Sequence, residues 1–223
     1  MLLLHYTGMP TGRAALARLC DPAAKVSAHY LIEEDGRIFA LVAEERRAWH
    51  AGQAYWQQAT DINARSIGIE LVNPGHDWGY RRFPEPQMQA LLGLAQDVVQ
   101  RHRIPADRVL GHSDVAPGRK QDPGELFDWR RLAAAGLGLW PASDFVISVH
   151  APVLAAGMSG PAVFDLQTAL AAIGYHLEGT ASFDPVTELA VIAFQRHFRQ
   201  NRIDGVADQE TASLIHHLAL REA

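Results

Sequence analysis

Short apolar segments alternate with polar turns over the first 110 residues. Residues 2–4 and 109–110 are apolar without interruption, as in strands that are buried on both faces. In residues 67–72, isoleucine and leucine occupy every second position, which predicts a strand with one apolar face. Residues 26–32 and 37–42 flank an acidic turn and predict a β-hairpin.

Three segments of the same region carry apolar residues at helical spacing: 14–19, 86–102 and 127–136. The longest begins at Pro86, and proline is favoured in the first turn of a helix. Strands interleaved with helices indicate an α/β fold. We therefore predict a mixed central β-sheet flanked by helices.

The pattern changes after residue 137, where glycine, proline and serine become frequent and indicate a linker. Beyond it, three short segments have apolar residues at helical spacing: 163–173, 185–194 and 214–218. They predict a small three-helix bundle, and because it carries no plausible catalytic set we interpret it as a binding module. The expected domains are residues 1–140 and 146–223.

Composition and charge exclude some classes of function and partner. The chain has 223 residues and a formal net charge of −5, and no cluster of Lys and Arg lies on a predicted helix face, which argues against nucleic acid or an anionic membrane as partner. No apolar run is long enough to cross a bilayer. The start of the chain has no leader pattern, so we expect a cytoplasmic protein, or a periplasmic or envelope-associated one if an upstream segment is missing. The single cysteine, Cys20, excludes a disulfide framework and is expected to be buried near a helix end.

The loop that follows residues 109–110 is the first candidate site. It carries His112, Lys120 and Asp122 among prolines and glycines that stiffen it and can aim side chains at one point. One histidine and one aspartate are a weak metal signal, so the interpretation needs a third ligand. His5 offers one, because it ends the strand at residues 2–6, where α/β folds place ligands.

Two imidazoles and one carboxylate form a common open zinc set that leaves a position for water. Glu70, inside an otherwise apolar strand, is the candidate general base, and Gly68 beside it leaves room for a close approach. The Lys120 ammonium would stabilise the oxyanion formed when a carbonyl is attacked. The predicted reaction is zinc-assisted hydrolysis of an amide; the alternative is that these are unrelated surface polar residues.

Aromatic residues flank a histidine in the loop that contains Trp49 and His50, followed by Gly52, Tyr55 and Trp56. Such a loop suits the wall of a binding site, because aromatic side chains are exposed in loops mainly where something binds. Packing of the aromatic rings on the core is the equally weighted alternative. We predict substrate contacts from His29, Trp49 and His50.

Five motifs together resemble the type 2 zinc N-acetylmuramoyl-L-alanine amidases, which are related in fold to peptidoglycan recognition proteins. They cover roughly residues 1–140 and are HYTG at 5–8, VSAHYLI at 26–32, AWHAG at 48–52, SIGIE at 66–70, and GHSD with DPG between 111 and 124. The resemblance implies one zinc ion per chain held by His5, His112 and Asp122, with Glu70 and Lys120 catalytic. It also implies cleavage of the amide between the lactyl group of N-acetylmuramic acid and L-alanine. Family members usually have more chain before the first ligand.

The part from residue 146 onward is similar to the peptidoglycan-binding domain found beside many cell-wall hydrolases, through segments such as FDLQ at 164–167, AFQ at 193–195 and DGVAD at 204–208. Two modules that imply one polymer predict a zinc amidase of cell-wall peptidoglycan or its muropeptide fragments, and residues 1–140 alone should then cleave soluble muropeptides. The alternatives are a peptidoglycan-binding protein with weak or no catalysis, which should lack a ligand, and a small-molecule deacylase, which leaves the helical bundle unexplained.

Overall fold

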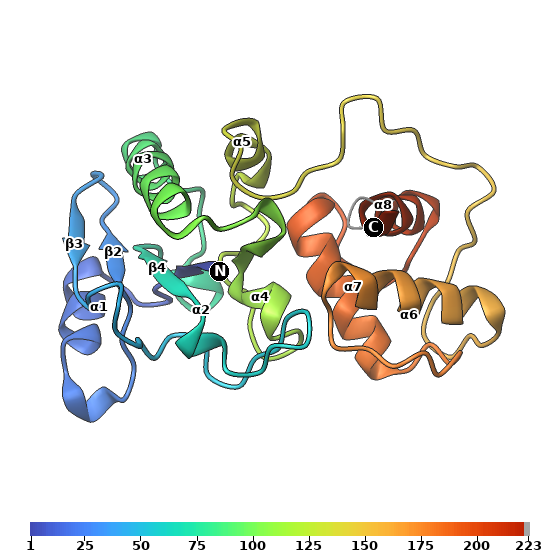
Figure 1. Cartoon of the computed structure of the whole chain (residues 1–223), viewed down its shortest axis with the longest axis horizontal. Helices are drawn as coiled ribbons and strands as arrows, with labels where there is room; N and C mark the ends of the chain where they lie inside the picture. The colour runs from blue at the N-terminus through green and yellow to red at the C-terminus, as the bar shows by residue number, and fades with distance from the viewer. Residues whose placement is uncertain (221–223) are drawn as a thin grey trace. The chain divides into compact units, whose positions relative to one another are not determined.

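The computed structural model describes residues 1–220, and this part of the chain forms two compact units (Figure 1). Unit 1 comprises residues 1–54, 61–112 and 122–139. Unit 2 comprises the C-terminal residues from Trp140 together with two short segments, 55–60 and 113–121, that interrupt unit 1 in the sequence. The predicted domain limits, 1–140 and 146–223, stay a prediction.

Unit 1 is built on a five-stranded sheet, which confirms the predicted α/β class. The strands lie in the order β3-β2-β4-β1-β5. All neighbouring strands are parallel except β2 and β3, which form the predicted hairpin. The strands are β1 (Leu2–Tyr6), β2 (Tyr30–Ile32), β3 (Ile38–Ala40), β4 (Ile67–Leu71) and β5 (Val109–Gly111). The central strands β1 and β4 are buried on both faces, which explains their nearly uninterrupted apolar sequence.

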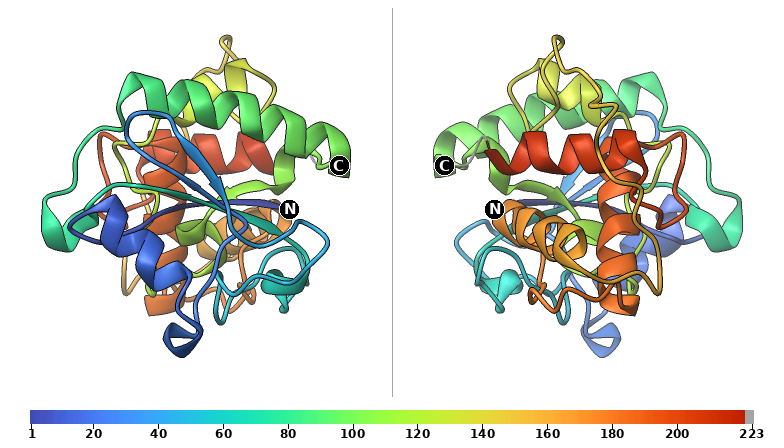
Figure 2. Two further views of the ribbon diagram at one scale, coloured as in Figure 1. Left: turned by 90° about the vertical axis from the view of Figure 1, so that its left-hand side faces the viewer. Right: turned by 90° about the vertical axis from the view of Figure 1, so that its right-hand side faces the viewer.

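Helices cover both faces of the sheet (Figures 1 and 2). Leu31 of β2 packs with Ala15 of α1 (Gly12–Leu19) on one face. The next residue back, Tyr30, points to the other face and donates its hydroxyl to Glu44, whose carboxylate also binds Arg101 at the end of α3 (Glu85–His102). The helices α1 and α3 therefore lie on opposite faces.

The strand register places the candidate base on the α1 face. Leu31 pairs with Glu70, and Glu70 pairs with His5, in parallel strands. Paired residues of neighbouring strands share a face, so His5 and Glu70 lie side by side on the face that α1 covers in part.

The remaining elements of unit 1 are short. They are α2 (Gly75–Trp78), α5 (Trp129–Ala134) and 3₁₀ helices at Pro22–Ala24, Ile62–Ala64 and Ala106–Arg108. A further helix, α4 (His112–Val115), begins in unit 1 and continues into unit 2. Three predictions were wrong. The strand expected at 26–32 begins only at Tyr30, and the segment after residue 110 is not a continuous loop because it contains α4. Cys20, which was expected to be buried, follows the last residue of α1 and is exposed.

The helices of unit 2 are α6 (Pro161–Ile173), α7 (Pro185–Phe198) and α8 (Gln209–Ala219), drawn orange to red in Figure 2. They confirm the three predicted helices, and α8 packs against the other two. Buried Gln167 and Gln195 make equivalent hydrogen bonds. The side-chain amide of Gln167 donates to the loop before α7 and to Thr187 in the first turn of α7. The side-chain amide of Gln195 donates to the loop before α8 and to Thr211 in the first turn of α8. The same internal device therefore holds α6 to α7 and α7 to α8.

Within residues 1–220, no helix is both long enough and apolar enough to span a membrane.

Glu44 gives a pH-dependent contribution to the stability of unit 1. Hydrogen bonds from Arg101, with further bonds from Tyr30 and His102, outweigh burial and lower the pKa of Glu44 to about 2, from 4.5 in an unperturbed carboxyl. A carboxyl whose pKa is lowered on folding stabilises the folded state above its unfolded pKa, and this is lost as the pH falls from 4.5 towards 2. Glu44→Gln should lower the free energy of unfolding by about 1 kcal/mol at pH 7, because the half-exposed Arg101 is screened by solvent.

Urea unfolding of both proteins at pH 7 and pH 3 checks this expectation. The difference between them should be smaller at pH 3. A difference that is the same at both values would show that the Glu44 charge does not contribute.

Candidate active site

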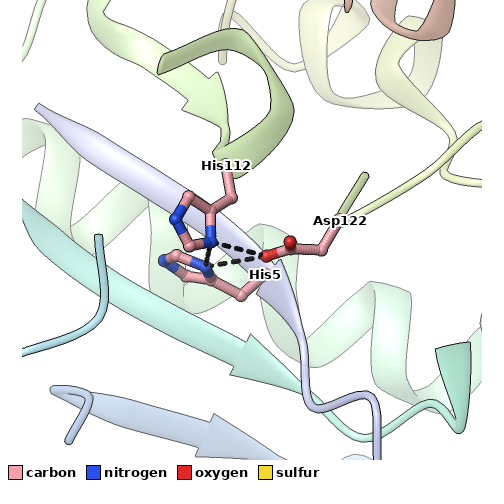
Figure 3. A group of neighbouring side chains, drawn as sticks. All are labelled: His5, His112 and Asp122. Carbon is pink, nitrogen blue, oxygen red and sulfur yellow. Dashed lines mark hydrogen bonds and ion pairs between the residues drawn. The ribbon is translucent and has the colours of Figure 1, made fainter. Parts of the chain in front are cut away.

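Two histidines and one aspartate from distant parts of the sequence meet in unit 1 (Figure 3). His5 Nδ1 lies 2.9 Å from His112 Nδ1 and 2.9 Å from Asp122 Oδ2, and His112 Nδ1 lies 3.0 Å from Asp122 Oδ2. All three side chains are buried. Each contributes one atom to a single point, as expected for a group that holds a metal ion.

Parallel pairing of β1 and β5 brings the two histidines together. Leu4 of β1 pairs with Gly111 of β5, and the residues that follow these two in the chain are His5 and His112. The carboxyl ends of neighbouring parallel strands meet at one edge of the sheet, where α/β folds place ligands. The sequence-based placement of His5 at a strand end is confirmed, while His112 follows β5 as the first residue of α4.

Tyr80 fixes the segment that follows Asp122. Its hydroxyl donates to the carbonyl of Pro123 at 2.7 Å and accepts from the amide of Leu126 at 2.9 Å. Gly124 has a φ of +85°, and a Cβ there would come within 2.3 Å of the Tyr80 hydroxyl, so only glycine fits.

A chain of hydrogen bonds sets the tautomer of His5. The Ser66 hydroxyl donates to the carbonyl of Ile62 at 2.6 Å, so its oxygen is left to accept from His50 Nε2 at 3.4 Å. Burial and the neighbouring imidazoles of His5, His29 and His112 lower the pKa of His50 well below its ordinary value, so its ring is neutral and Nδ1 is an acceptor. His5 Nε2, 3.0 Å away, therefore donates to His50 Nδ1, and His5 Nδ1 faces the cluster with a lone pair.

His112 reaches the same state through the backbone. Its Nε2 lies 2.9 Å from the carbonyl oxygen of Ala51, which can only accept, so Nε2 carries the proton and Nδ1 is an acceptor. Asn63 holds this loop in place, since its Oδ1 accepts from the amides of His50 and Ala51. Two imidazole lone pairs and one carboxylate thus face one another in a buried site, an arrangement that a cation stabilises.

Gly68 lets the His50 ring lie against the sheet. A Cβ at Gly68 would come within 2.5 Å of that ring, so the close approach predicted at this glycine is confirmed. Gly68 and Glu70 are two residues apart on β4 and point to the same face. Glu70 is 8% exposed and pairs with His5 in the strand register, so its carboxylate belongs to the same face as the cluster.

The other predicted site residues lie in different surroundings. Lys120 is two residues before Asp122 in the chain and is half-buried within the segment 113–121 of unit 2. Trp49 is 56% exposed, and the guanidinium of Arg47 lies 5.7 Å from its ring centroid. This exposure suits the predicted contact between Trp49 and substrate, which stays a prediction.

His29 and His50, for which contacts with substrate were predicted, are both buried. His29 is fully buried, its Nε2 donates to the carbonyl of Arg46, and its Nδ1 accepts from the amide of Gly68. Both of its ring nitrogens are therefore used by the backbone. His50 is 6% exposed and its Nδ1 bonds His5. The contacts of His29 and His50 with substrate stay predictions.

Sequence reasoning missed Asn63, Ser66 and Tyr80. Asn63 lies in a short 3₁₀ helix and Ser66 lies just after it, where polar residues are common. The amides that Asn63 binds are at least 12 residues away in the chain. His50, which bonds Ser66, is 16 residues away. Tyr80 acts on a segment 43 residues further along the chain. No local pattern in the sequence predicts contacts between residues so far apart in the chain.

Two family models match separate parts of the chain. Residues 1–125 match the family model described as N-acetylmuramoyl-L-alanine amidase, and residues 159–215 match a putative peptidoglycan binding domain. The chain is 37% identical to the N-acetylmuramoyl-L-alanine amidase AmiD of Escherichia coli over 230 residues, which covers 96% of this chain and 80% of AmiD.

Two solved structures resemble the whole chain. One is E. coli AmiD in complex with the substrate anhydro-N-acetylmuramic acid-L-Ala-D-gamma-Glu-L-Lys, with a TM-score of 0.85, 35% identity and coverage of 99% of this chain and 88% of that one. The other is AmpDh3 from Pseudomonas aeruginosa in complex with an anhydromuramic pentapeptide, with a TM-score of 0.83, 34% identity and coverage of 99% and 91%. With a family model that spans more than half of it and a relative that matches nearly its full length, the chain belongs to the N-acetylmuramoyl-L-alanine amidases and is an enzyme of that amidohydrolase family.

Proposed function

We propose that this protein hydrolyses the amide bond between the lactyl group of N-acetylmuramic acid and L-alanine, in peptidoglycan and in its soluble muropeptide fragments. The observation that carries the proposal is the convergence of His5 Nδ1, His112 Nδ1 and Asp122 Oδ2, each with a lone pair directed at the same point. Membership of the amidase family supports the choice of bond.

One zinc ion per chain is the cofactor that fits this cluster. Zinc takes imidazole nitrogen and carboxylate oxygen, and its catalytic sites use three protein ligands and leave one position open. The hydrogen bonds from His5 to His50 and from His112 to Ala51 are the outer partners that orient ligating histidines in such sites. A bound zinc ion would act as a Lewis acid towards the amide carbonyl and lower the pKa of a water molecule towards neutrality.

Glu70 and Lys120 then have separate roles. The Glu70 carboxylate, on the face of the sheet that carries His5, would accept the proton of the attacking water and deliver it to the leaving nitrogen of L-alanine. The Lys120 ammonium, two residues from Asp122, would stabilise the negative charge that develops on the carbonyl oxygen.

The C-terminal helices would hold the enzyme on its polymeric substrate. The match of residues 159–215 to a putative peptidoglycan binding domain supports this role. Weak binding at a second point raises the local concentration of cell wall around the active site without any change in the site itself.

The products of a defined substrate test the proposal. Zinc-loaded protein should convert anhydro-N-acetylmuramyl-L-Ala-D-γ-Glu-L-Lys into the sugar acid and the free tripeptide, and mass spectrometry should find only these two products. Purified sacculi should release stem peptides that begin with L-alanine. No cleavage by zinc-loaded protein, as a binding protein would show, or cleavage inside the peptide or glycan would contradict the proposal.

Lys120→Met should slow the reaction without removing the metal. Methionine keeps the length of the side chain but not its charge, so the loss falls on the transition state, and one such donor is worth about 10²- to 10³-fold in kcat. Steady-state kinetics on a soluble muropeptide, beside the zinc content, check this. Arg119→Met, one residue earlier in the same segment, is the control for loss of a positive charge, and an equal loss of kcat in both variants would argue against a specific role for Lys120.

A further inference from the structure

The segment between two ligands of the cluster is packed as part of the C-terminal helical unit. Residues 113–121 connect His112 to Asp122, and their contacts group them with unit 2. Residues 55–60 belong to the same unit. The C-terminal helices therefore hold the chain that joins two of the three ligands, in addition to any binding of cell wall.

Asp114 is the main attachment point of this segment. It is 1% exposed, its Oδ2 lies 2.8 Å from His197 Nδ1 on α7, and its Oδ1 accepts the hydroxyl of Tyr175 at 3.2 Å. Burial and the nearby carboxylate raise the pKa of Tyr175 well above its ordinary value, so the hydroxyl keeps its proton and donates it. A carboxylate this deeply buried is stable only with such partners.

Further contacts surround the same attachment. A Cβ at Gly118 would come within 2.7 Å of Leu189 on α7. The Tyr55 ring stacks on His176 with centroids 4.1 Å apart, and the Tyr55 amide donates to the carbonyl of Val115 at 2.8 Å. The two inserted segments are thus bonded to each other as well as to the C-terminal helices.

The short helix α4 links this attachment to the metal cluster. It carries His112 and Asp114 two positions apart, and residues two apart on a helix project about 200° from each other around its axis. His112 points to the cluster, and Asp114 points away from it to α7. A rotation of α4 that displaced the His112 ring would have to break the bond between Asp114 and His197.

We propose that Asp114, held by His197 and Tyr175 within unit 2, is a positioning residue: it fixes the segment 113–121, and through the continuous chain the two residues that flank it, His112 and Asp122, for metal binding. The proposal rests on the proposed role of the cluster as a zinc site. It revises the expectation that residues 1–140 alone cleave soluble muropeptides normally, because that fragment lacks both His197 and Tyr175.

Variants of His197 in the full-length chain test the proposal. His197→Leu keeps much of the side-chain volume and removes the donor to Asp114, whereas His197→Asn places an amide donor near the position of Nδ1. We expect His197→Leu to bind zinc about 10-fold more weakly, in line with the cost of losing outer partners of a metal site, and His197→Asn to restore most of the affinity. Competition with a chromogenic chelator measures the zinc dissociation constant directly.

Kinetics and a matched control separate positioning from general stability. With zinc in excess, His197→Leu should recover the wild-type kcat on a soluble muropeptide, and its binding to sacculi should be unchanged. Thr211→Val removes a buried hydroxyl that bonds Gln195 and Arg199 in the same unit but does not touch segment 113–121. This control should lower the melting temperature and leave zinc affinity as it is.

The outcomes are distinct. If folded His197→Leu binds zinc as tightly as the wild type, the positioning role of Asp114 is refuted and the proposed function stands. The same holds if Thr211→Val loses as much zinc affinity as His197→Leu. Should His197→Leu fail to fold, Asp114→Asn takes its place, since it keeps the shape of the side chain and removes its charge; wild-type affinity there has the same consequence. A wild-type protein that binds no zinc at all would instead refute the proposed function.

Discussion

His112→Ala should give a folded protein that holds no zinc and cleaves no muropeptide. His112 supplies one of only three converging ligand atoms in the described cluster, and it is buried, so no neighbouring side chain can swing in from solvent to replace it. Loss of an outer partner of a ligand costs about 10–100-fold in metal affinity, and loss of the ligand itself should exceed that range. The expected loss of activity follows from the loss of the metal rather than from unfolding.

Metal analysis, thermal unfolding and turnover of the same preparation check this result. His150→Ala, at an exposed histidine of unit 2, is the control and should keep both zinc and activity. Retention of one zinc per chain by His112→Ala would remove His112 from the ligand set.

Glu70→Gln should keep zinc and lose most of its activity. The amide has the same shape as the carboxylate and the backbone register with His5 is unchanged, but it cannot accept a proton. Loss of a general base costs about 10²- to 10⁴-fold in rate, and the effect should fall on kcat because the proton moves only in the transition state. The acidic limb of the pH–rate profile should disappear in this variant and persist in Lys120→Met.

Zinc content beside kcat and KM on a purified muropeptide measures the effect. Glu85→Gln is the matched control, since Glu85 lies at the start of α3, the helix on the opposite face of the sheet, and bonds Arg131 there. Near-normal kcat in zinc-loaded Glu70→Gln would exclude Glu70 as the base.

The sheet and the three C-terminal helices were predictable because burial sets their sequence pattern. Strands buried on both faces read as apolar runs, and helices packed on one side repeat every three or four residues. The helix α4 could not be predicted, because a helix of one turn shows no period and proline and glycine stand two and three residues after its end. Cys20 is exposed because it ends α1 at the surface, a position that its residue type does not indicate.

The meeting of His5 and His112 could be predicted from the sequence for a specific reason. His5 is the last residue but one of β1 and His112 directly follows β5, and parallel pairing brings the ends of these strands to one edge. The residues that hold these histidines in place could not be predicted from the sequence, because their contacts join segments that are far apart in the chain. His50 meets His5 across 45 residues, and His197 meets Asp114 across 83. The compartment in which the enzyme acts stays a prediction from the sequence.

Titration of metal-free protein with zinc tests the role of the cluster most directly. Protein stripped of metal should be inactive on anhydro-N-acetylmuramyl-L-Ala-D-γ-Glu-L-Lys. Release of the tripeptide should then rise in proportion to the zinc added and reach its maximum at one ion per chain, as expected for a single three-ligand site. Full activity in protein shown to contain no metal, or a maximum reached only with several ions per chain, would contradict a catalytic zinc ion held by His5, His112 and Asp122.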